Sequence, residues 1–255
     1  MPLDTDHDWK RWGKTDPYYS VLSLPQYHRN VLDDSALEAF FGSGHKHVDH
    51  VLSVLRQHFR SDFKPSRALD YGCGVGRVAI PLARNSDHVI AIDVSPAMLE
   101  EAAQNASRRD VHNIEYLLAG QLSSVAPESI DLIHSFIVFQ HIDNSRGLVI
   151  LQDLLSKLKP GGLGAIHLIY ERKAPVLRHL VAAIRRRSRT VHSIVNLLQG
   201  RSFSEPAIQM NTYSLNKVFG LLYAAGCGLV FSEFSHHSEF VGVMLYLEKT
   251  QPPVL

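Results

Sequence analysis

The sequence predicts an α/β fold in which helices cover both faces of a mostly parallel β-sheet. From Arg67 onward, short β-rich runs alternate with segments of helical periodicity, and this alternation is typical of parallel sheets with helical crossovers. A glycine-rich turn at Gly72, Gly74 and Gly76 follows the first run, and the second run ends on an acidic residue, Asp93. These observations predict the fold class and indicate a ligand site at the carboxyl ends of the strands.

Composition and charge narrow the class of protein further. The chain has 255 residues, 45% hydrophobic and 20% charged, which is enough for one or two domains with a substantial core. Its formal net charge of +1 excludes a histone-like or acidic-tail protein. Two cysteines exclude a disulfide scaffold and a paired-cysteine zinc site, and they favour a reducing compartment.

The sequence pattern predicts neither a signal peptide nor a membrane span. The opening stretch MPLDTDHDWKRWGK is polar where a signal peptide needs an apolar core. No apolar run reaches the roughly 18 residues of a membrane span. We therefore expect a cytoplasmic protein that does not contact a membrane.

The segment 1–64 is predicted to form an N-terminal helical arm or cap. Apolar residues recur at helical spacing in its second half, namely Val48, Val51, Leu52, Leu55 and Phe59. The tripeptide Lys-Pro-Ser at 64–66 then breaks the pattern. The main domain is expected to cover 65–255.

The elements of the main domain follow in order along the chain. β-Rich runs predict strands at 67–71, 88–93, 114–118, 130–136, 162–170, 227–234 and 240–249. Helical periodicity predicts helices at 76–85, 95–106, 148–158 and 214–226. The last two strands are joined by SHHSE, which predicts a β-hairpin that closes the sheet.

A long connection after Tyr170 interrupts this alternation. The segment 171–212 is long for a connection and has helix-like content, so we expect a helical lid inserted after the fifth strand. From Arg172 to Arg201 the lid has eight basic residues and no Asp or Glu, which leaves the rest of the chain at −7. Such a run is usually a solvated helix face, but it could also receive a phosphate or carboxylate on a substrate.

The stretch DYGCGVGR, at 70–77, is the motif that points to chemistry. Its glycines permit a tight turn from strand to helix and let a ligand approach the backbone. The helix that follows offers unpaired N–H groups to that ligand. A dinucleotide fingerprint would need glycine where Arg77 stands, so the match to a nicotinamide site is poor.

Asp93 lies seventeen residues beyond Gly76, at the end of the second predicted strand. An acid in this place can accept hydrogen bonds from both ribose hydroxyls of an adenosine. Ser95 and Pro96 suit the N-cap and first position of the next helix. Glycine turns and strand-end acids are each common, but together at this spacing they favour a nucleoside site.

The sequence resembles the class I S-adenosylmethionine-dependent methyltransferases over roughly 67–248. The resemblance is carried by LDYGCGVGRVAIPLA, AIDVSPAMLEEA, SIDLIHSFIVFQHI and LKPGGLGAIHL, which occur in the family's order and spacing. It implies a seven-stranded sheet in the order 3-2-1-4-5-7-6 with the last strand antiparallel. It also implies S-adenosylmethionine bound over the carboxyl ends of strands 1, 2 and 4, in agreement with the general rule for open α/β sheets.

The resemblance further implies which residues bind this cofactor. Those expected at its methionine portion are Asp70, Gly72, Cys73, Gly74, Ser135 and Phe136. Those expected at its adenosine are Asp93 for the ribose, with Val94, Met98 and Gln121 near the adenine. Gln121 stands where the family often has an acid, so its amide oxygen would replace the carboxylate.

Methyl transfer from a sulfonium is an in-line displacement, so the enzyme mainly has to align acceptor and methyl group in a water-poor pocket. A hydroxyl acceptor also benefits from a base. His141, just past the fourth strand, is the candidate base, although a histidine there could instead brace the loop. Asp143 and Asn144 follow it, but a helix N-cap explains them better than a metal site, so we predict no metal.

Regions outside the shared core are expected to form the acceptor site. The N-terminal arm is rich in aromatic residues, which could stack on a sugar or base or simply anchor the arm (Trp9, Trp12, Tyr18, Tyr19 and Tyr27). Tyr170 ends the fifth strand at the rim of the expected pocket. The predicted substrate-binding residues are Tyr18, Tyr19, Tyr170 and Arg178.

The leading hypothesis is O-methylation of a small polar acceptor such as a sugar, a nucleotide-linked sugar or a hydroxylated metabolite. RNA methylation through the basic lid is an alternative, and so is a non-catalytic cofactor-binding partner protein. We do not expect a nucleic-acid partner, because the chain has neither an appended RNA-binding module nor an N-P-P-Y-like tetrapeptide. The sequence leaves the oligomeric state open.

Overall fold

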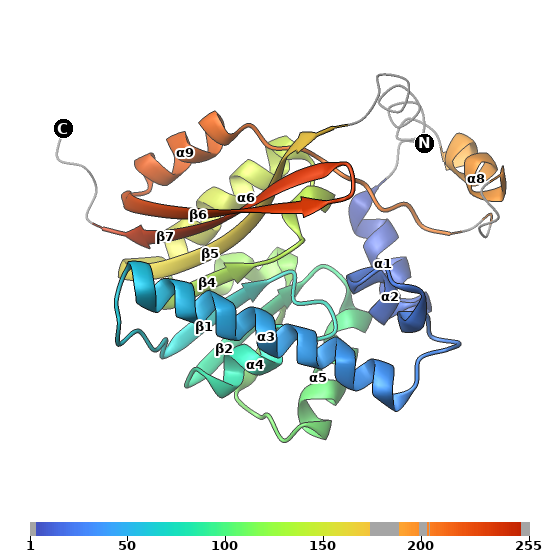
Figure 1. Ribbon diagram of the computed structural model, residues 1–255, viewed down its shortest axis with the longest axis horizontal. Helices are drawn as coiled ribbons and strands as arrows, with labels where there is room; N and C mark the ends of the chain where they lie inside the picture. The colour runs from blue at the N-terminus through green and yellow to red at the C-terminus, as the bar shows by residue number, and fades with distance from the viewer. Residues whose placement is uncertain (1–3, 174–188, 199–202, 204, 251–255) are drawn as a thin grey trace.

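The structure is a computed structural model that describes residues 4–173, 189–198, 203 and 205–250. At its centre is a seven-stranded sheet in the order β3-β2-β1-β4-β5-β7-β6 (Figure 1). The strands are β1 (Arg67–Tyr71), β2 (His88–Asp93), β3 (Ile114–Leu118), β4 (Ile130–Ser135), β5 (Leu158–Arg172), β6 (Cys227–His237) and β7 (Phe240–Lys249). β7 runs antiparallel to β5 and β6, whereas the pairs among β1 to β5 are parallel. The predicted strand order and the antiparallel last strand are confirmed.

Helices cover both faces of this sheet. The α-helices are α1 (Thr5–Thr15), α2 (Pro17–Val21), α3 (Asp34–His58), α4 (Ala79–Arg84), α5 (Pro96–Arg108), α6 (Asn144–Lys157), α8 (Arg189–Leu198) and α9 (Leu215–Ala224). Short 3-10 helices are η1 (Pro25–Tyr27), η2 (Ala119–Ser124) and η3 (Phe139–His141). Asp143 caps α6 by accepting a hydrogen bond from the Ser145 backbone N–H (3.0 Å), as the sequence predicted.

Neighbouring residues of each central strand point to opposite faces, because side chains alternate along a β-strand. Ala68 of β1 and Leu132 of β4 belong to the core on the side of α3 and α4. Leu69 and Ile133 belong to the core on the side of α6 and α9. The sheet is therefore buried on both faces, which explains why its inner strands are apolar almost throughout.

The predicted arm, 1–64, divides into two parts with different roles. Its second half is the long helix α3, which lies across the sheet (Figure 1) and buries Phe40, Val48 and Leu55 completely. Its first half contains α1 and α2, which lie at the end of the sheet where β1, β2 and β4 finish (Figure 1). α1 packs closely on the start of α5, because a Cβ added at Gly13 would lie 2.3 Å from the Ser95 hydroxyl. Only this first half is placed to cover a site at the strand ends.

Two glycines of α3 provide a matched test of this packing. A Cβ added at Gly44 would lie 1.9 Å from the Arg77 carbonyl oxygen, whereas one added at Gly42 would meet nothing within 4 Å. We expect Gly44→Ala to lower the free energy of unfolding by about 1–3 kcal/mol, because α3 must move away from the sheet. Gly42→Ala should raise it by up to about 1 kcal/mol through helix propensity. Urea unfolding of both variants measures the difference, and equal effects would contradict the close packing at Gly44.

The predicted lid, 171–212, is described only in part. β5 extends through Arg172, α8 forms a helix, and the chain from 205 to 214 is extended on its way to α9. Arg178 and most of the other basic residues of the lid lie outside the described residues. Among the helices that are described, none combines the length and the apolar character needed to cross a membrane.

Candidate functional site

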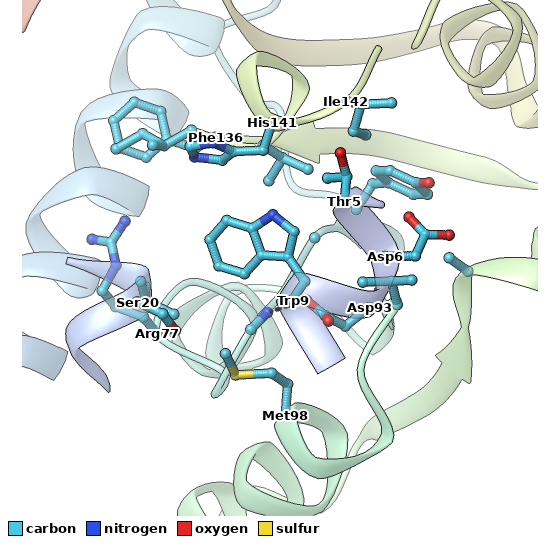
Figure 2. Close-up of a pocket in the computed structure, with 18 of the residues that line it drawn as sticks. Thr5, Asp6, Trp9, Ser20, Arg77, Asp93, Met98, Phe136, His141 and Ile142 are labelled. Atoms are coloured by element: carbon cyan, nitrogen blue, oxygen red, sulfur yellow. Dashed lines mark hydrogen bonds between the residues drawn. The ribbon is translucent and has the colours of Figure 1, made fainter. Parts of the chain in front are cut away.

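A cavity lies at the carboxyl ends of β1, β2 and β4, beside α1 (Figure 2). Seven of the predicted site residues line it, and they come from the glycine turn, the end of β2, the start of α5 and the chain after β4. They are Gly72, Gly74, Asp93, Val94, Met98, Phe136 and His141. Residues far apart in the sequence thus meet where the topology of the sheet predicts a ligand.

The glycine turn forms the floor of this cavity. Gly72 and Gly74 have positive φ angles of 80° and 53°, a region of backbone conformation that favours glycine. A Cβ at Gly72 would lie 2.3 Å from the Val138 side chain, and one at Gly74 would lie 2.8 Å from that of Val21. The turn therefore presents bare backbone, as the sequence predicted.

Asp93 ties this turn to the start of α5. Its Oδ2 accepts a hydrogen bond from the Gly74 N–H (2.9 Å), and its Oδ1 accepts one from the Ser95 N–H (2.9 Å). Burial raises the pKa of Asp93 to about 6, although these N–H groups oppose the shift. Each carboxylate oxygen has a second lone pair, so Asp93 can still accept hydrogen bonds from a diol in the cavity.

His141 projects from η3 into the cavity, above the indole of Trp9 (Figure 2). Its Nδ1 donates a hydrogen bond to the Gln209 carbonyl oxygen (2.7 Å), so the proton of the neutral ring lies on Nδ1 and Nε2 is left as an acceptor. Burial lowers the pKa of His141 to about 4. The ring is therefore uncharged at neutral pH and has a lone pair available for a proton.

The chain that returns from the lid holds the His141 loop in place. The Asn211 side-chain amide donates to the carbonyl oxygens of Gln140 (3.2 Å) and Ile142 (3.0 Å). The Tyr213 hydroxyl is 2.9 Å from the carbonyl oxygens of Phe139 and Ile142. These contacts, together with that of Gln209, fix the position of the His141 ring from a segment some seventy residues later in the chain.

The N-terminal helix α1 forms one wall of the cavity through Thr5, Asp6 and Trp9. The Trp9 indole lies 5.0 Å from the His141 ring, centroid to centroid. Asp6 forms a bidentate ion pair with Arg146 of α6, with N–O distances of 2.6 and 2.9 Å. Sequence reasoning had named Trp9 among several aromatic residues of the arm but had missed Asp6 and Arg146, since neither belongs to a motif.

Four predicted cofactor contacts lie outside the cavity lining. Asp70 is buried behind it and accepts a hydrogen bond from His134 Nδ1 (2.8 Å), and burial raises the pKa of the Cys73 thiol. The Ser135 hydroxyl donates to the Tyr71 carbonyl oxygen (2.9 Å). The Gln121 amide oxygen accepts from the Leu118 N–H (2.9 Å), so it is occupied within its own turn.

The predicted acceptor contacts are also distributed differently from the expectation. The Tyr18 hydroxyl donates to Glu101 (2.6 Å), which anchors α2 on α5. Tyr19 stacks on His28 at 3.7 Å, and Tyr170 lies 6.1 Å from Phe234. These three tyrosines are absent from the cavity lining in the described part of the chain. Arg178 lies outside the described residues.

A buried chain of polar groups runs behind the cavity. His134 Nδ1 donates a hydrogen bond to the Asp70 carboxylate, and His134 Nε2 is 2.9 Å from the Nε2 of His47 on α3. Because Asp70 keeps the proton of His134 on Nδ1, His47 must be the donor between the two rings. Burial lowers the pKa of His47 to about 2, and its ring stacks on Phe136 at 4.0 Å. The sequence has 15 histidines, but no motif among them pointed to this arrangement.

Comparisons with known proteins agree with the geometry. Residues 68–162 match a family described as "Methyltransferase domain". The mitochondrial ubiquinone biosynthesis O-methyltransferase of Schizosaccharomyces pombe is 32% identical over 117 residues, which cover 45% of this chain and 41% of that protein. The corresponding protein of Rickettsia typhi is 27% identical over 139 residues, 54% of this chain and 55% of its own length. The chain thus spans about half the length of the curated relatives it matches.

A solved structure shows the same fold over nearly the whole chain. Magnesium protoporphyrin IX methyltransferase of Synechocystis PCC 6803, with bound S-adenosylhomocysteine, superposes with a TM-score of 0.63 at 16% identity. The match covers 97% of this chain and 100% of that one. At this identity the similarity establishes the fold alone.

Proposed function

We propose that this chain, which belongs to the class I S-adenosylmethionine-dependent methyltransferases, transfers a methyl group to a hydroxyl oxygen of a small acceptor. The observation that carries the proposal is that His141, uncharged and with Nε2 available, lines the same cavity as Asp93 and the glycine turn. The relatives named ubiquinone biosynthesis O-methyltransferases support oxygen as the methylated atom.

The residues of the cavity fit the family's cofactor. Gly72 and Gly74 line the cavity with bare backbone, where an added Cβ would collide with Val138 or Val21. Asp93 can accept hydrogen bonds from ribose hydroxyls. Val94 and Met98 provide apolar walls for an adenine. When bound, S-adenosylmethionine supplies an electrophilic methyl group on a positively charged sulfur.

The chain's own residues then have two tasks. Trp9 and Phe136 enclose the acceptor and keep water out, which favours an aligned, desolvated approach. His141 Nε2 takes the proton of the acceptor hydroxyl as the oxygen attacks. The hydrogen bond from Nδ1 to the Gln209 carbonyl stabilises the positive charge that His141 gains in this step.

The lining favours one class among the acceptors considered. Trp9, Tyr71, Phe136 and His141 contribute four rings to the cavity, and such walls pack best against flat apolar faces. We therefore propose a hydroxylated aromatic metabolite in preference to a sugar or nucleotide-linked sugar. Methyl transfer to catechols, to sugars and to RNA, measured by mass spectrometry, tests this choice. O-Methylated catechol supports it, and methylation confined to sugars or RNA would overturn it.

Cofactor binding should depend on pH through Asp93. Because burial raises the pKa of Asp93 to about 6, the carboxylate becomes protonated as the pH falls below that value and loses acceptor strength. We expect the Kd for S-adenosylhomocysteine to be constant above about pH 7 and to rise by up to about tenfold per pH unit below 6. Calorimetry from pH 5 to 8 measures this dependence. An equally steep rise in the Asp93→Asn variant would assign it to another group.

Two alternative hypotheses are distinguished by simple assays. RNA methylation depends on the basic residues of 172–201, most of which lie outside the described residues, and salt-sensitive RNA binding would support it. A non-catalytic binding protein would release no S-adenosylhomocysteine from S-adenosylmethionine with any acceptor. The cytoplasmic location expected from the sequence remains a prediction.

A further inference from the structure

The ion pair between Asp6 and Arg146 lies in the cavity wall, and the proposed mechanism does not use it. Asp6 is in the first turn of α1, and Arg146 is near the start of α6. The two Nη groups of Arg146 donate to separate oxygens of Asp6, at 2.6 and 2.9 Å, and these bonds raise the pKa of Arg146. A bidentate pair of this kind fixes both side chains in one geometry.

On one side, the pair holds the half of α1 that contains Trp9. Asp6 and Trp9 are three residues apart, so they lie on the same face of the helix, and both line the cavity (Figure 2). The other half of α1 is held separately, because Gly13 packs directly against Ser95. The ion pair is therefore a second point of attachment, at the half of the helix that contains Trp9.

On the other side, the pair is attached to the segment that contains His141. Arg146 follows His141 by five positions, and the α6 cap lies between them. Asp143 accepts hydrogen bonds from the Ser145 N–H (3.0 Å) and from the Ser145 hydroxyl (2.5 Å). This cap fixes the start of α6 next to η3, so the position of Arg146 follows from that of the His141 loop.

The two ends of the pair thus lead to two rings that lie beside each other in the cavity. The Trp9 and His141 ring centroids are 5.0 Å apart, and the ring planes are tilted by 54°. His141 is held independently of α1, because its Nδ1 donates to the Gln209 carbonyl oxygen. A displacement of α1 would therefore move Trp9 away from His141 and leave the base in place.

We propose that Asp6 and Arg146 are positioning residues for the acceptor site, and that their ion pair holds Trp9 at the distance from His141 at which the acceptor fits. This inference rests on the proposed function, because the acceptor is the ligand that Trp9 and His141 are proposed to contact. The pair acts on the acceptor through Trp9 and not by touching the reacting atoms.

Steady-state methylation of catechol tests the pair. Asp6→Asn and Arg146→Gln should each raise the KM for catechol by about 3- to 10-fold and change kcat by less than about 2-fold, because the base stays in place. Arg146→Lys, which keeps the charge without the bidentate geometry, should lie in between. The double variant should be no worse than either single variant, since both changes remove the same contact.

Glu38→Gln is the matched control. It breaks an ion pair with Arg109 (2.8 Å) that also joins two helices, α3 and α5. That pair lies outside the cavity lining in the part of the chain that the structure describes. Its loss should leave the KM for catechol at the wild-type value.

Acrylamide quenching of tryptophan fluorescence tests the position of Trp9 without any acceptor. The chain has two tryptophans, and the other, Trp12, is only 4% exposed. Quenching of the ligand-free protein, corrected with a Trp9→Phe variant, therefore reports the exposure of Trp9. The quenching constant should rise in Asp6→Asn and in Arg146→Gln, and no further in the double variant.

Three results would overturn the inference. They are unchanged quenching in both single variants, additive effects of the two substitutions on KM, and a lowered Tm with a loss of kcat at unchanged KM. The last result would assign the pair to the stability of the fold. If the wild-type chain methylates no catechol, the proposed acceptor fails, and the quenching experiment alone decides whether the pair positions Trp9.

Discussion

Asp93→Asn should weaken S-adenosylhomocysteine binding by about 100-fold or more. The carboxylate can accept both ribose hydroxyls while its oxygens also hold the Gly74 and Ser95 N–H groups, and an amide has only one acceptor oxygen. Hydrogen bonds to a charged group contribute about 1.5–3 kcal/mol each. Losing two of them therefore corresponds to at least two factors of ten in Kd. Isothermal titration calorimetry measures the change.

The control for Asp93 is Asp110→Asn, because the Asp110 side chain is 96% exposed and lies far along the chain at the end of α5. It should bind like wild type. Circular dichroism and Tm show whether the Asp93 variant is folded, since Asn can still hold one of the two N–H groups. Wild-type affinity in a folded Asp93→Asn protein would refute the role of this residue.

His141→Gln should lower kcat by about 10²- to 10⁴-fold, the usual contribution of a general base. Its affinity for S-adenosylhomocysteine should stay close to wild type, because in the proposed mechanism His141 contacts the acceptor and not the cofactor. His112→Gln is the control, since its side chain is 71% exposed. A kcat that is unchanged in His141→Gln would leave alignment and desolvation as the whole of catalysis.

The pH dependence of kcat gives a second readout for His141. Burial lowers the pKa of His141 to about 4, so the ring remains a base from neutral pH down to about 5. We expect kcat at saturating cofactor and acceptor to be nearly constant from pH 8 to 5. A decrease centred near 6.5, the usual value for histidine, would contradict a buried, uncharged ring.

The fold was predictable because its signals are local and agree with one another. The strands, the glycine turn and Asp93 at the end of β2 can each be predicted from a few consecutive residues. The glycine turn and Asp93 both line the observed cavity. The helix cap at Asp143 belongs to the same class of signal. Each of these features depends on residues that are close together in the sequence, and each is found in the structure where it was predicted.

The rest of the site depends on contacts between distant segments. Asp6 meets Arg146 across 140 positions, and His141 meets the Gln209 backbone across 68, so no short motif could reveal either pair. Tyr18 had the right residue type and neighbourhood, but its hydroxyl is used to join α2 to α5. Which aromatic residue of the arm enters the cavity is decided by how α1 packs on α5.

A crystal structure with S-adenosylhomocysteine bound is the most direct test of the claim that one cavity aligns cofactor, acceptor and base. We predict the ribose on Asp93, the adenine against Val94 and Met98, and the sulfur facing His141 Nε2 with room for one acceptor hydroxyl between them. Adenosine bound elsewhere, or a sulfur that points away from His141, would contradict the account.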